Sequence, residues 1–148
     1  MDSLKWGIQL NPLKCISTDK GDILRGMKKS DDGFKDFGEA YFSCILPGSA
    51  KGWKCHKKMT LNFVVPVGSI KFAIFNSDQN GKPDHLSGAI EFILGRDDYS
   101  RLTIPPGLWV GFFGLGGDES MLLNIASHEH DPMEADNIDI SSFDYKWE

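Results

Sequence analysis

The feature that most constrains the fold of this chain is a series of short apolar runs, separated at short intervals by turn-forming residues. The connecting stretches, among them PGSAKG, PVG, GRDDY, PPG and GLGGDES, are rich in Gly, Pro, Asp and Ser, which favour turns. This spacing is typical of an all-β sandwich or barrel. The apolar runs predict strands at residues 40–46, 54–65, 69–75, 89–94, 101–104, 108–115 and 121–127.

Helical patterns are short in this sequence. The stretch DPMEADNI predicts one short helix, with Asp131 as its N-cap and Pro132 at its first position. Neither an internal repeat nor a linker is visible, and 148 residues is an ordinary length for one domain. We therefore expect a single all-β domain over residues 1–148.

The charge and composition argue against several classes of protein. The net charge is −5, whereas a nucleic-acid-binding domain is usually basic. The apolar runs are far shorter than the roughly 18 residues of a membrane helix, and MDSLKWGIQL lacks the pattern of a secretory signal. The 3 cysteines form no C-x-x-C pair, which fits reduced thiols. We expect a cytoplasmic protein that binds neither nucleic acid nor membrane.

The predicted strand at residues 54–65 has one unusually polar face. Because successive strand side chains point to opposite sides, this face carries Lys54, His56, Lys58, Thr60 and Asn62. Lysines are common on a solvent-exposed edge, but a polar line also suits the ligand cavity of a jelly-roll barrel. The pattern alone leaves both open. The same alternation places Cys55 opposite His56, which favours a packed thiol over a nucleophile.

Three segments, GSAKGWKCHKK, RLTIPPGLWVGF and LLNIASHEHDPMEADNI, carry a family resemblance. In order and spacing they resemble the cupin-type dTDP-4-dehydrorhamnose 3,5-epimerases and the related dTDP-4-keto-6-deoxyhexose 3,4-ketoisomerases. The resemblance implies a cupin-like jelly-roll β-barrel and a homodimer. It also implies a nucleotide-linked sugar as substrate, with no cofactor and no metal.

The motifs match unevenly. Lys51 and Gly52 fall on the Arg-Gly of the epimerase motif Arg-Gly-x-His, and Lys54 falls on its histidine. His56 matches the second histidine of the ketoisomerase motif Arg-Gly-Gly-His-x-His. The family's acid tyrosine is replaced by Asn124, and the histidine of Ile-Pro-x-Gly-x-x-His-Gly-Phe is replaced by Val110.

The resemblance and the chemistry of the side chains assign candidate roles. We expect His56 as the general base, Lys54 as a stabiliser of the enolate or a second base, and Tyr41 as the replacement acid. The candidates for substrate binding are Lys51, Glu39, Asn62, Trp109, Asn124 and Arg25. Each has a structural alternative: Tyr41 as a barrel tyrosine, Trp109 as core, Arg25 as part of a solvated charged run.

The implied activity is that of a nucleotide-sugar 3- and/or 5-epimerase. It would act on a dTDP-linked 4-keto-6-deoxyhexose by removing a proton next to the ketone. Two alternatives remain from the sequence: a 3,4-ketoisomerase of the same substrate class, favoured by His56, and a non-catalytic sugar-nucleotide-binding protein. We interpret His128 and His130 as side chains that are exposed to solvent or paired with a carboxylate. No metal site is therefore predicted.

Overall fold

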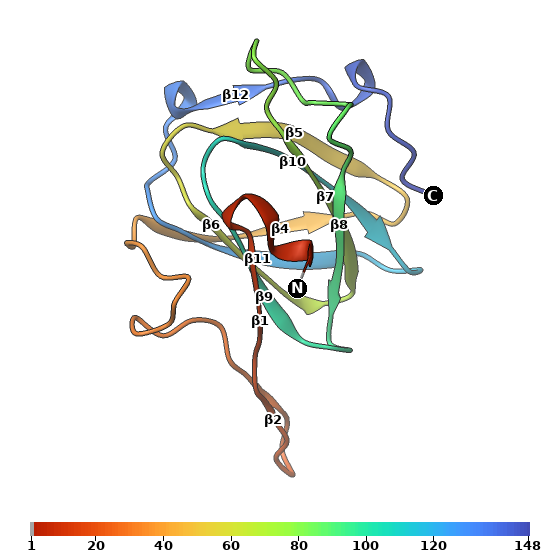
Figure 1. The fold of residues 1–148 in the computed structure, drawn as a ribbon. Helices are drawn as coiled ribbons and strands as arrows, with labels where there is room; N and C mark the ends of the chain where they lie inside the picture. The colour runs from red at the N-terminus through yellow and green to blue at the C-terminus, as the bar shows by residue number, and fades with distance from the viewer. Residues whose placement is uncertain (1) are drawn as a thin grey trace.

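Two five-stranded antiparallel sheets face each other in a computed structural model that describes residues 2–148, with side chains from Lys5 onward (Figure 1). Sheet 1 contains, in spatial order, β1 (Gln9–Pro12), β9 (Ser100–Ile104), β6 (Leu61–Val67), β11 (Ser120–Ala126) and β4 (Glu39–Ile45). Sheet 2 contains β12 (Ala135–Asn137), β5 (Ala50–His56), β10 (Leu108–Leu115), β7 (Ser69–Asn76) and β8 (Ile90–Gly95). This arrangement confirms the predicted all-β, cupin-like jelly roll.

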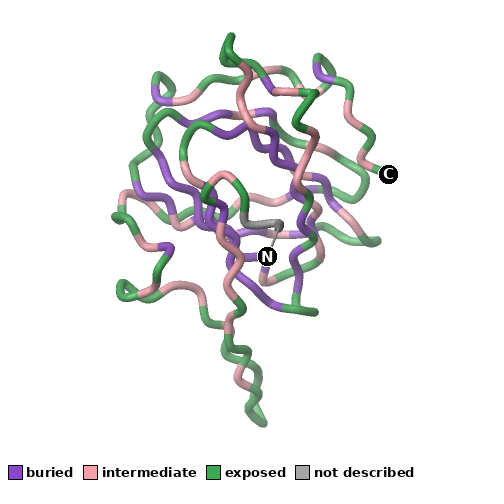
Figure 2. Tube along the Cα trace, in the orientation of Figure 1, coloured by how far each residue is buried: buried purple, intermediate pink, exposed green. Residues whose placement is uncertain are grey.

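The main core lies between the two sheets, where the strands are buried (Figure 2). The inward-facing side chains of both sheets alternate with outward-facing ones, as the pleat requires. Phe63 of β6 and Phe72 of β7 stack across the gap, with ring centroids 5.1 Å apart. These contacts join the two sheets.

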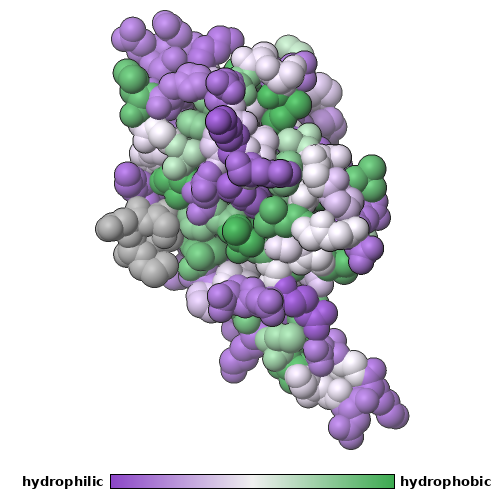
Figure 3. All heavy atoms as spheres, turned by 90° about the vertical axis from the view of Figure 1, so that its right-hand side faces the viewer, coloured by the Kyte–Doolittle hydropathy of each residue, from purple (hydrophilic) through white to green (hydrophobic). Residues whose placement is uncertain are grey.

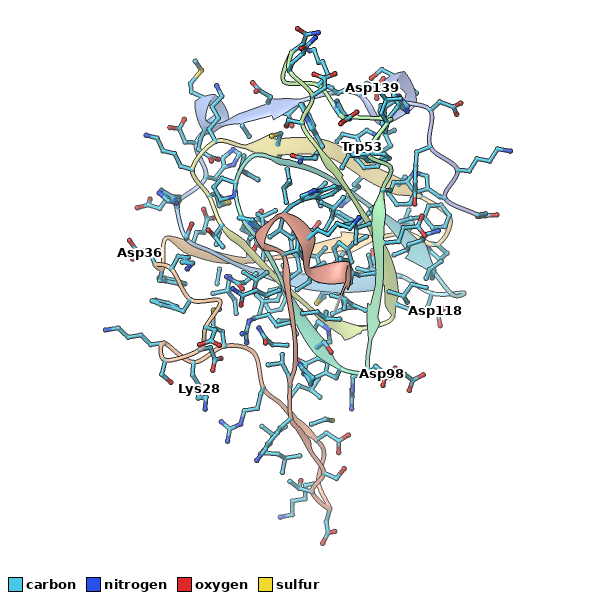
Figure 4. All side chains as sticks on the ribbon, in the orientation of Figure 1. Lys28, Asp36, Trp53, Asp98, Asp118 and Asp139 are labelled. Atoms are coloured by element: carbon cyan, nitrogen blue, oxygen red, sulfur yellow. The ribbon has the colours of Figure 1, made fainter. Side chains whose placement is uncertain are left out.

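A second, aromatic core covers the outer face of sheet 2. The segment that follows β12, including the short 3₁₀ helix η3 (Ile140–Ser142), runs back over this face. Trp53, labelled in Figure 4, stacks on Trp147 and meets Phe143 edge-on. Sheet 2 is therefore apolar on both faces, which explains why the run LWVGFFG does not alternate with polar residues.

The strand hairpin β2 (Cys15–Ile16) and β3 (Ile23–Leu24) forms an arm that projects from the body, and its tip is hydrophilic (Figure 3). Two contacts tie the arm to the turn after β8. Arg96 forms an ion pair with Asp22 at 2.8 Å, and the hydroxyl of Tyr99 donates to the carbonyl of Arg25 at 2.7 Å. The remaining elements are the 3₁₀ helices η1 (Asp2–Gly7) and η2 (Pro132–Glu134).

Most predicted strands are confirmed to within about one residue, but the single strand at 54–65 is wrong. The chain instead forms β5 and β6, separated by a turn over residues 57–60. The carboxylate of Glu134 accepts the backbone N–H groups of Lys58 and Met59, and the hydroxyl of Ser127 accepts that of Thr60. Partners more than 60 residues away in the chain thus satisfy the backbone of the turn.

The short helix predicted in DPMEADNI is confirmed over Pro132–Glu134 as η2, in which the Asp131 side chain accepts the N–H of Met133 at 3.0 Å. The next residues of that stretch, Ala135–Asn137, form strand β12 and not helix. The short elements β1, β2, β3 and β12 were not predicted. They are 2 to 4 residues long, too short to show an alternating pattern. Strand β12 pairs with β5 through register partners such as Ala135 and His56.

Gly111 in β10 gives a test of the aromatic core. A Cβ added there would lie 2.8 Å from the ring of Trp53. We expect Gly111→Ala to lower the free energy of unfolding by roughly 1–3 kcal/mol through overpacking, measured by urea denaturation. Gly117→Ala is the control, because nothing lies within 4 Å of its Cβ position. Equal stability of the two variants would contradict this packing.

Candidate functional site

A cavity of about 250 Å³ opens between the two sheets. Its polar residues come from β4 and β5, which belong to different sheets, and its apolar floor comes from β6, β10 and β11. The lining residues are Tyr41, Ser43, Lys51, Gly52, Lys54, His56, Leu61, Phe63, Val110, Phe112 and Leu122. The sequence candidates His56, Lys54, Tyr41 and Lys51 are therefore brought together in one place.

A β-bulge in β5 allows three of these groups to share the cavity. On β10, Val110 pairs with Lys54 and Phe112 pairs with Lys51, so β5 contains one residue more than its partner over this stretch. The extra residue reverses the alternation, and both lysines face the cavity. Gly52 occupies the bulge with φ 131°, and a Cβ there would lie 2.8 Å from the backbone of the neighbouring strand.

His56 is held by a buried carboxylate. Its Nδ1 lies 2.6 Å from Oε1 of Glu134, and the side chains of both residues are at most 10% exposed. Burial raises the pKa of Glu134, but hydrogen bonds from His56 and from the backbone N–H groups of Lys58 and Met59 outweigh it and bring the pKa to about 2. The carboxylate is therefore ionised at neutral pH.

An ionised Glu134 fixes the tautomer of His56. Because a carboxylate without a proton only accepts hydrogen bonds, Nδ1 must carry the proton that joins the pair. When the ring is neutral, Nε2 is left as its proton acceptor, in an imidazole that lines the cavity. Glu134 was not among the residues predicted from the sequence, because its partners at residues 56–59 lie more than 70 positions away in the chain.

Tyr41 stands on the other wall. Its strand, β4, is the edge strand of sheet 1, and its hydroxyl accepts a hydrogen bond from Nδ2 of Asn124 at 3.1 Å. Lys51 reaches from β5 toward the same strand, where its ammonium donates to the hydroxyl of Ser43 at 3.3 Å and to the carbonyl of Cys44. The cavity thus has a basic wall on β5 and a hydroxyl wall on β4.

The polar line proposed for residues 54–62 does not continue past the turn. Asn62 points away from the cavity, donates to the carbonyl of Gly33 at 3.1 Å and accepts from Thr103. The turn resets the alternation, so that β6 presents Leu61 and Phe63 to the cavity instead. Asn62 is a structural link between sheet 1 and the loop that precedes β4.

Four other candidates also lie outside the cavity lining. Trp109 faces the aromatic core, with its indole N–H donating to the carbonyl of Gly81 at 3.3 Å. Asn124 is fully buried. Glu39 accepts the backbone N–H of His130 at 2.9 Å. Arg25 is exposed at the base of the arm, on the same connection as Lys28, which Figure 4 places at the periphery.

Other potentially reactive groups are accounted for by packing. Cys55 lies in the aromatic core on the opposite face of β5 from His56, and burial raises the pKa of its thiol. Among the residues that the structure describes, no group of three or more His, Cys, Asp or Glu side chains could hold a metal ion. No helix within that part of the chain is long and apolar enough to cross a membrane.

No family model matches this chain. A crystal structure of a dTDP sugar isomerase from Desulfovibrio desulfuricans G20 is 31% identical to it with a TM-score of 0.85, over 96% of this chain and 91% of that one. The Haloferax volcanii protein described as "Probable low-salt glycan biosynthesis epimerase Agl13" is 24% identical over 132 residues, 87% of this chain and 83% of that protein.

A sugar 3,4-ketoisomerase, QdtA from Thermoanaerobacterium thermosaccharolyticum, has been solved in complex with TDP. It superposes with a TM-score of 0.73 and 21% identity over 89% of this chain and 88% of that one. At this identity the likeness shows a shared fold.

Glu134→Gln should change how stability depends on pH. The carboxyl has a pKa of about 2 in the fold against 4.5 ordinarily, so its contribution is present above pH 4.5 and is lost as the pH falls toward 2. We expect the difference in unfolding free energy between wild type and variant to shrink by about 3 kcal/mol between pH 6 and pH 2, measured by urea denaturation. Asp118→Asn, in an exposed loop, is the control. Parallel curves for wild type and Glu134→Gln would contradict the assignment.

Proposed function

Because this chain belongs to the cupin-like family of dTDP-sugar epimerases and ketoisomerases, we propose that it is a 3- and/or 5-epimerase of a dTDP-linked 4-keto-6-deoxyhexose. The observation that carries the proposal is the cavity with the His56–Glu134 pair on one wall and Tyr41 on the other. Inverting a carbon requires a base on one side of the sugar ring and a proton donor on the opposite side. The two sheets supply one group each.

In the proposed reaction, Nε2 of His56 takes the proton from the carbon next to the ketone. The electron pair of that C–H bond forms the enolate, and the imidazolium that results is stabilised by the ionised Glu134. Tyr41 then delivers a proton to the same carbon from the other face. Each proton transfer of this kind contributes about 10²–10⁴-fold to the rate.

Lys54 and Lys51 supply positive charge. Lys54 shares the cavity with His56, and we assign it to the ketone oxygen, where negative charge develops in the enolate. This charge lets the proposed reaction proceed without a metal or other cofactor. Lys51 lies beside Ser43, next to the rim strand β4, and we assign it to the diphosphate as a point charge.

The size of the cavity limits what it can enclose. Sites for drug-sized ligands usually exceed about 300 Å³, and this cavity is about 250 Å³. We therefore propose that only the sugar ring enters and that the nucleotide lies outside. The apolar floor of Leu61, Phe63 and Leu122 suits the methyl group of a 6-deoxy sugar.

A 3,4-ketoisomerase is the second candidate. One observation favours it: Lys54 and His56 are two residues apart on the same face of β5. Two groups on one side of the ring could shuttle a proton between neighbouring carbons without inversion. The products separate the candidates, because isomerisation moves the ketone and epimerisation does not.

The decisive experiment follows the protons of dTDP-4-keto-6-deoxyglucose by NMR in deuterated water with the protein present. We expect loss of the C3 or C5 proton signal, a 10²–10⁴-fold slower loss with His56→Ala, and a wild-type rate with the control His85→Ala, in an exposed loop. A shifted ketone would identify a ketoisomerase. Contact without exchange would identify a binding protein and contradict catalysis.

We also propose that the protein is a cytoplasmic homodimer. Phe42 of β4 is 62% exposed on the outer face of sheet 1, and its half-buried cross-strand neighbour Leu123 forms a short apolar row with it. Strand β4 is the edge strand of sheet 1, and no strand among the described residues pairs with its outer side. A second copy of the chain, related by two-fold symmetry, would cover this row and the open edge.

Phe42→Asp tests the dimer. A charge in the apolar row should weaken self-association by at least tenfold, measured by sedimentation velocity over a range of concentrations. Ile93→Asp is the matched control, because Ile93 is equally exposed, at 63%, but lies on β8 in the other sheet. A monomeric wild type, or equal loss in both variants, would contradict the assigned interface.

A further inference from the structure

Asn124 occupies the position of the family's acid tyrosine, yet it is 0% exposed and does not line the cavity. We propose that Asn124 is a positioning residue that orients Tyr41 so that the phenol proton points into the cavity. This inference rests on the proposed function and specifies how its second proton transfer is arranged. The proton donor, Tyr41, then lies on β4, and Asn124 on β11 orients it.

The orientation of the Asn124 amide follows from its surroundings. The backbone N–H of Asn62 in β6 lies 3.1 Å from Oδ1 of Asn124. A backbone N–H is only a donor, so the atom that faces it must be the amide oxygen. The amide therefore cannot flip without leaving two donors face to face in a buried site.

The fixed amide determines what Tyr41 can do. Nδ2 of Asn124 lies 3.1 Å from the Tyr41 hydroxyl, and an amide NH₂ group offers no acceptor. The hydroxyl oxygen accepts this bond, and its own proton must point elsewhere. Among the side chains from Lys5 onward and the backbone of residues 2–148, the Tyr41 hydroxyl has no other hydrogen-bond partner, and the Tyr41 side chain lines the cavity. The proton is therefore available to a bound ligand.

The geometry of the sheet makes this arrangement possible. Strands β4 and β11 lie side by side in sheet 1 (Figure 1), and Tyr41 and Asn124 are direct cross-strand partners in their register. Such partners have Cβ atoms about 4.5–5.5 Å apart on one face. The phenol of Tyr41 can consequently reach the part of the cavity wall that a tyrosine at position 124 would reach.

The proton balance of the step is complete. His56 holds the proton removed from carbon, and the enolate electron pair forms the new C–H bond with the phenol proton. The ketone is restored, Tyr41 is left as a phenolate, and water returns a proton to Tyr41 while it removes one from His56. Deuterium exchange needs only His56, which can return a solvent deuteron to the same face, whereas inversion needs Tyr41.

Two substitutions at one position test the role. In Asn124→Asp one carboxylate oxygen still accepts the Asn62 N–H, but the other accepts the Tyr41 proton and turns it away from the cavity. In Asn124→Leu no acceptor replaces the amide, so the proton stays available, although the Asn62 N–H loses its partner. Asn80→Asp, in an exposed loop, is the matched control.

The rates of net epimerisation and of deuterium exchange are both measured on dTDP-4-keto-6-deoxyglucose by NMR in deuterated water. The stability of each protein is measured by urea unfolding. We expect Asn124→Asp to lower net epimerisation by about 10²–10⁴-fold while deuterium exchange falls only a few-fold, as in Tyr41→Phe. Asn124→Leu should be less stable than Asn124→Asp and yet epimerise faster. If the role of Asn124 were purely structural, the less stable of the two variants would also epimerise more slowly.

Equal losses of exchange and epimerisation in Asn124→Asp, or an unchanged epimerisation rate, would overturn the inference and leave the proposed function standing. A wild-type protein that exchanges no substrate proton would overturn the proposed function, and this inference with it. The proposal that Asn124 orients Tyr41 is supported only if Asn124→Asp lowers epimerisation much more than deuterium exchange.

Discussion

The buried carboxylate of Glu134 joins two parts of the chain that are distant in sequence, because its three partners lie within residues 56–59, 75 to 78 positions before it. It accepts hydrogen bonds from the Lys58 and Met59 backbone in the turn after β5, and it holds Nδ1 of His56 at 2.6 Å. The same group therefore ends a strand, shapes a turn and selects the tautomer of the proposed base. Its low pKa, about 2, follows from these three bonds, which outweigh the cost of burial.

Much of the fold could be predicted from local sequence, because alternation and turn residues act over a few positions. The strand at residues 108–115 was predicted with the bounds it has. The turn between β5 and β6 could not be predicted in this way. KKMT contains no Gly or Pro, and its backbone is satisfied by Glu134 and Ser127, which arrive from the far end of the chain.

Two irregularities, the bulge at Gly52 and the turn between β5 and β6, decide which candidate residues reach the cavity. Counting by twos correctly puts Lys54 and His56 on one face, because no irregularity lies between them. The count fails for Asn62, beyond the turn, and it could not place Lys51 beside Lys54, because the bulge at Gly52 adds one residue. Trp109 was predicted as a substrate-binding residue, but its neighbour Val110 is the one that lines the cavity.

Charge placement links these irregularities to chemistry. Without the bulge, Lys51 would face the aromatic core of Trp53, where an unpaired ammonium would be costly. With the bulge, two ammonium groups and one imidazole line a small cavity, no Asp or Glu is among its described lining residues, and the carboxylate of Glu134 is engaged by His56. A cavity with uncompensated positive charge favours a ligand that carries or develops negative charge. An enolate develops such charge as it forms, which is why the lysine-rich wall is compatible with proton abstraction next to a ketone.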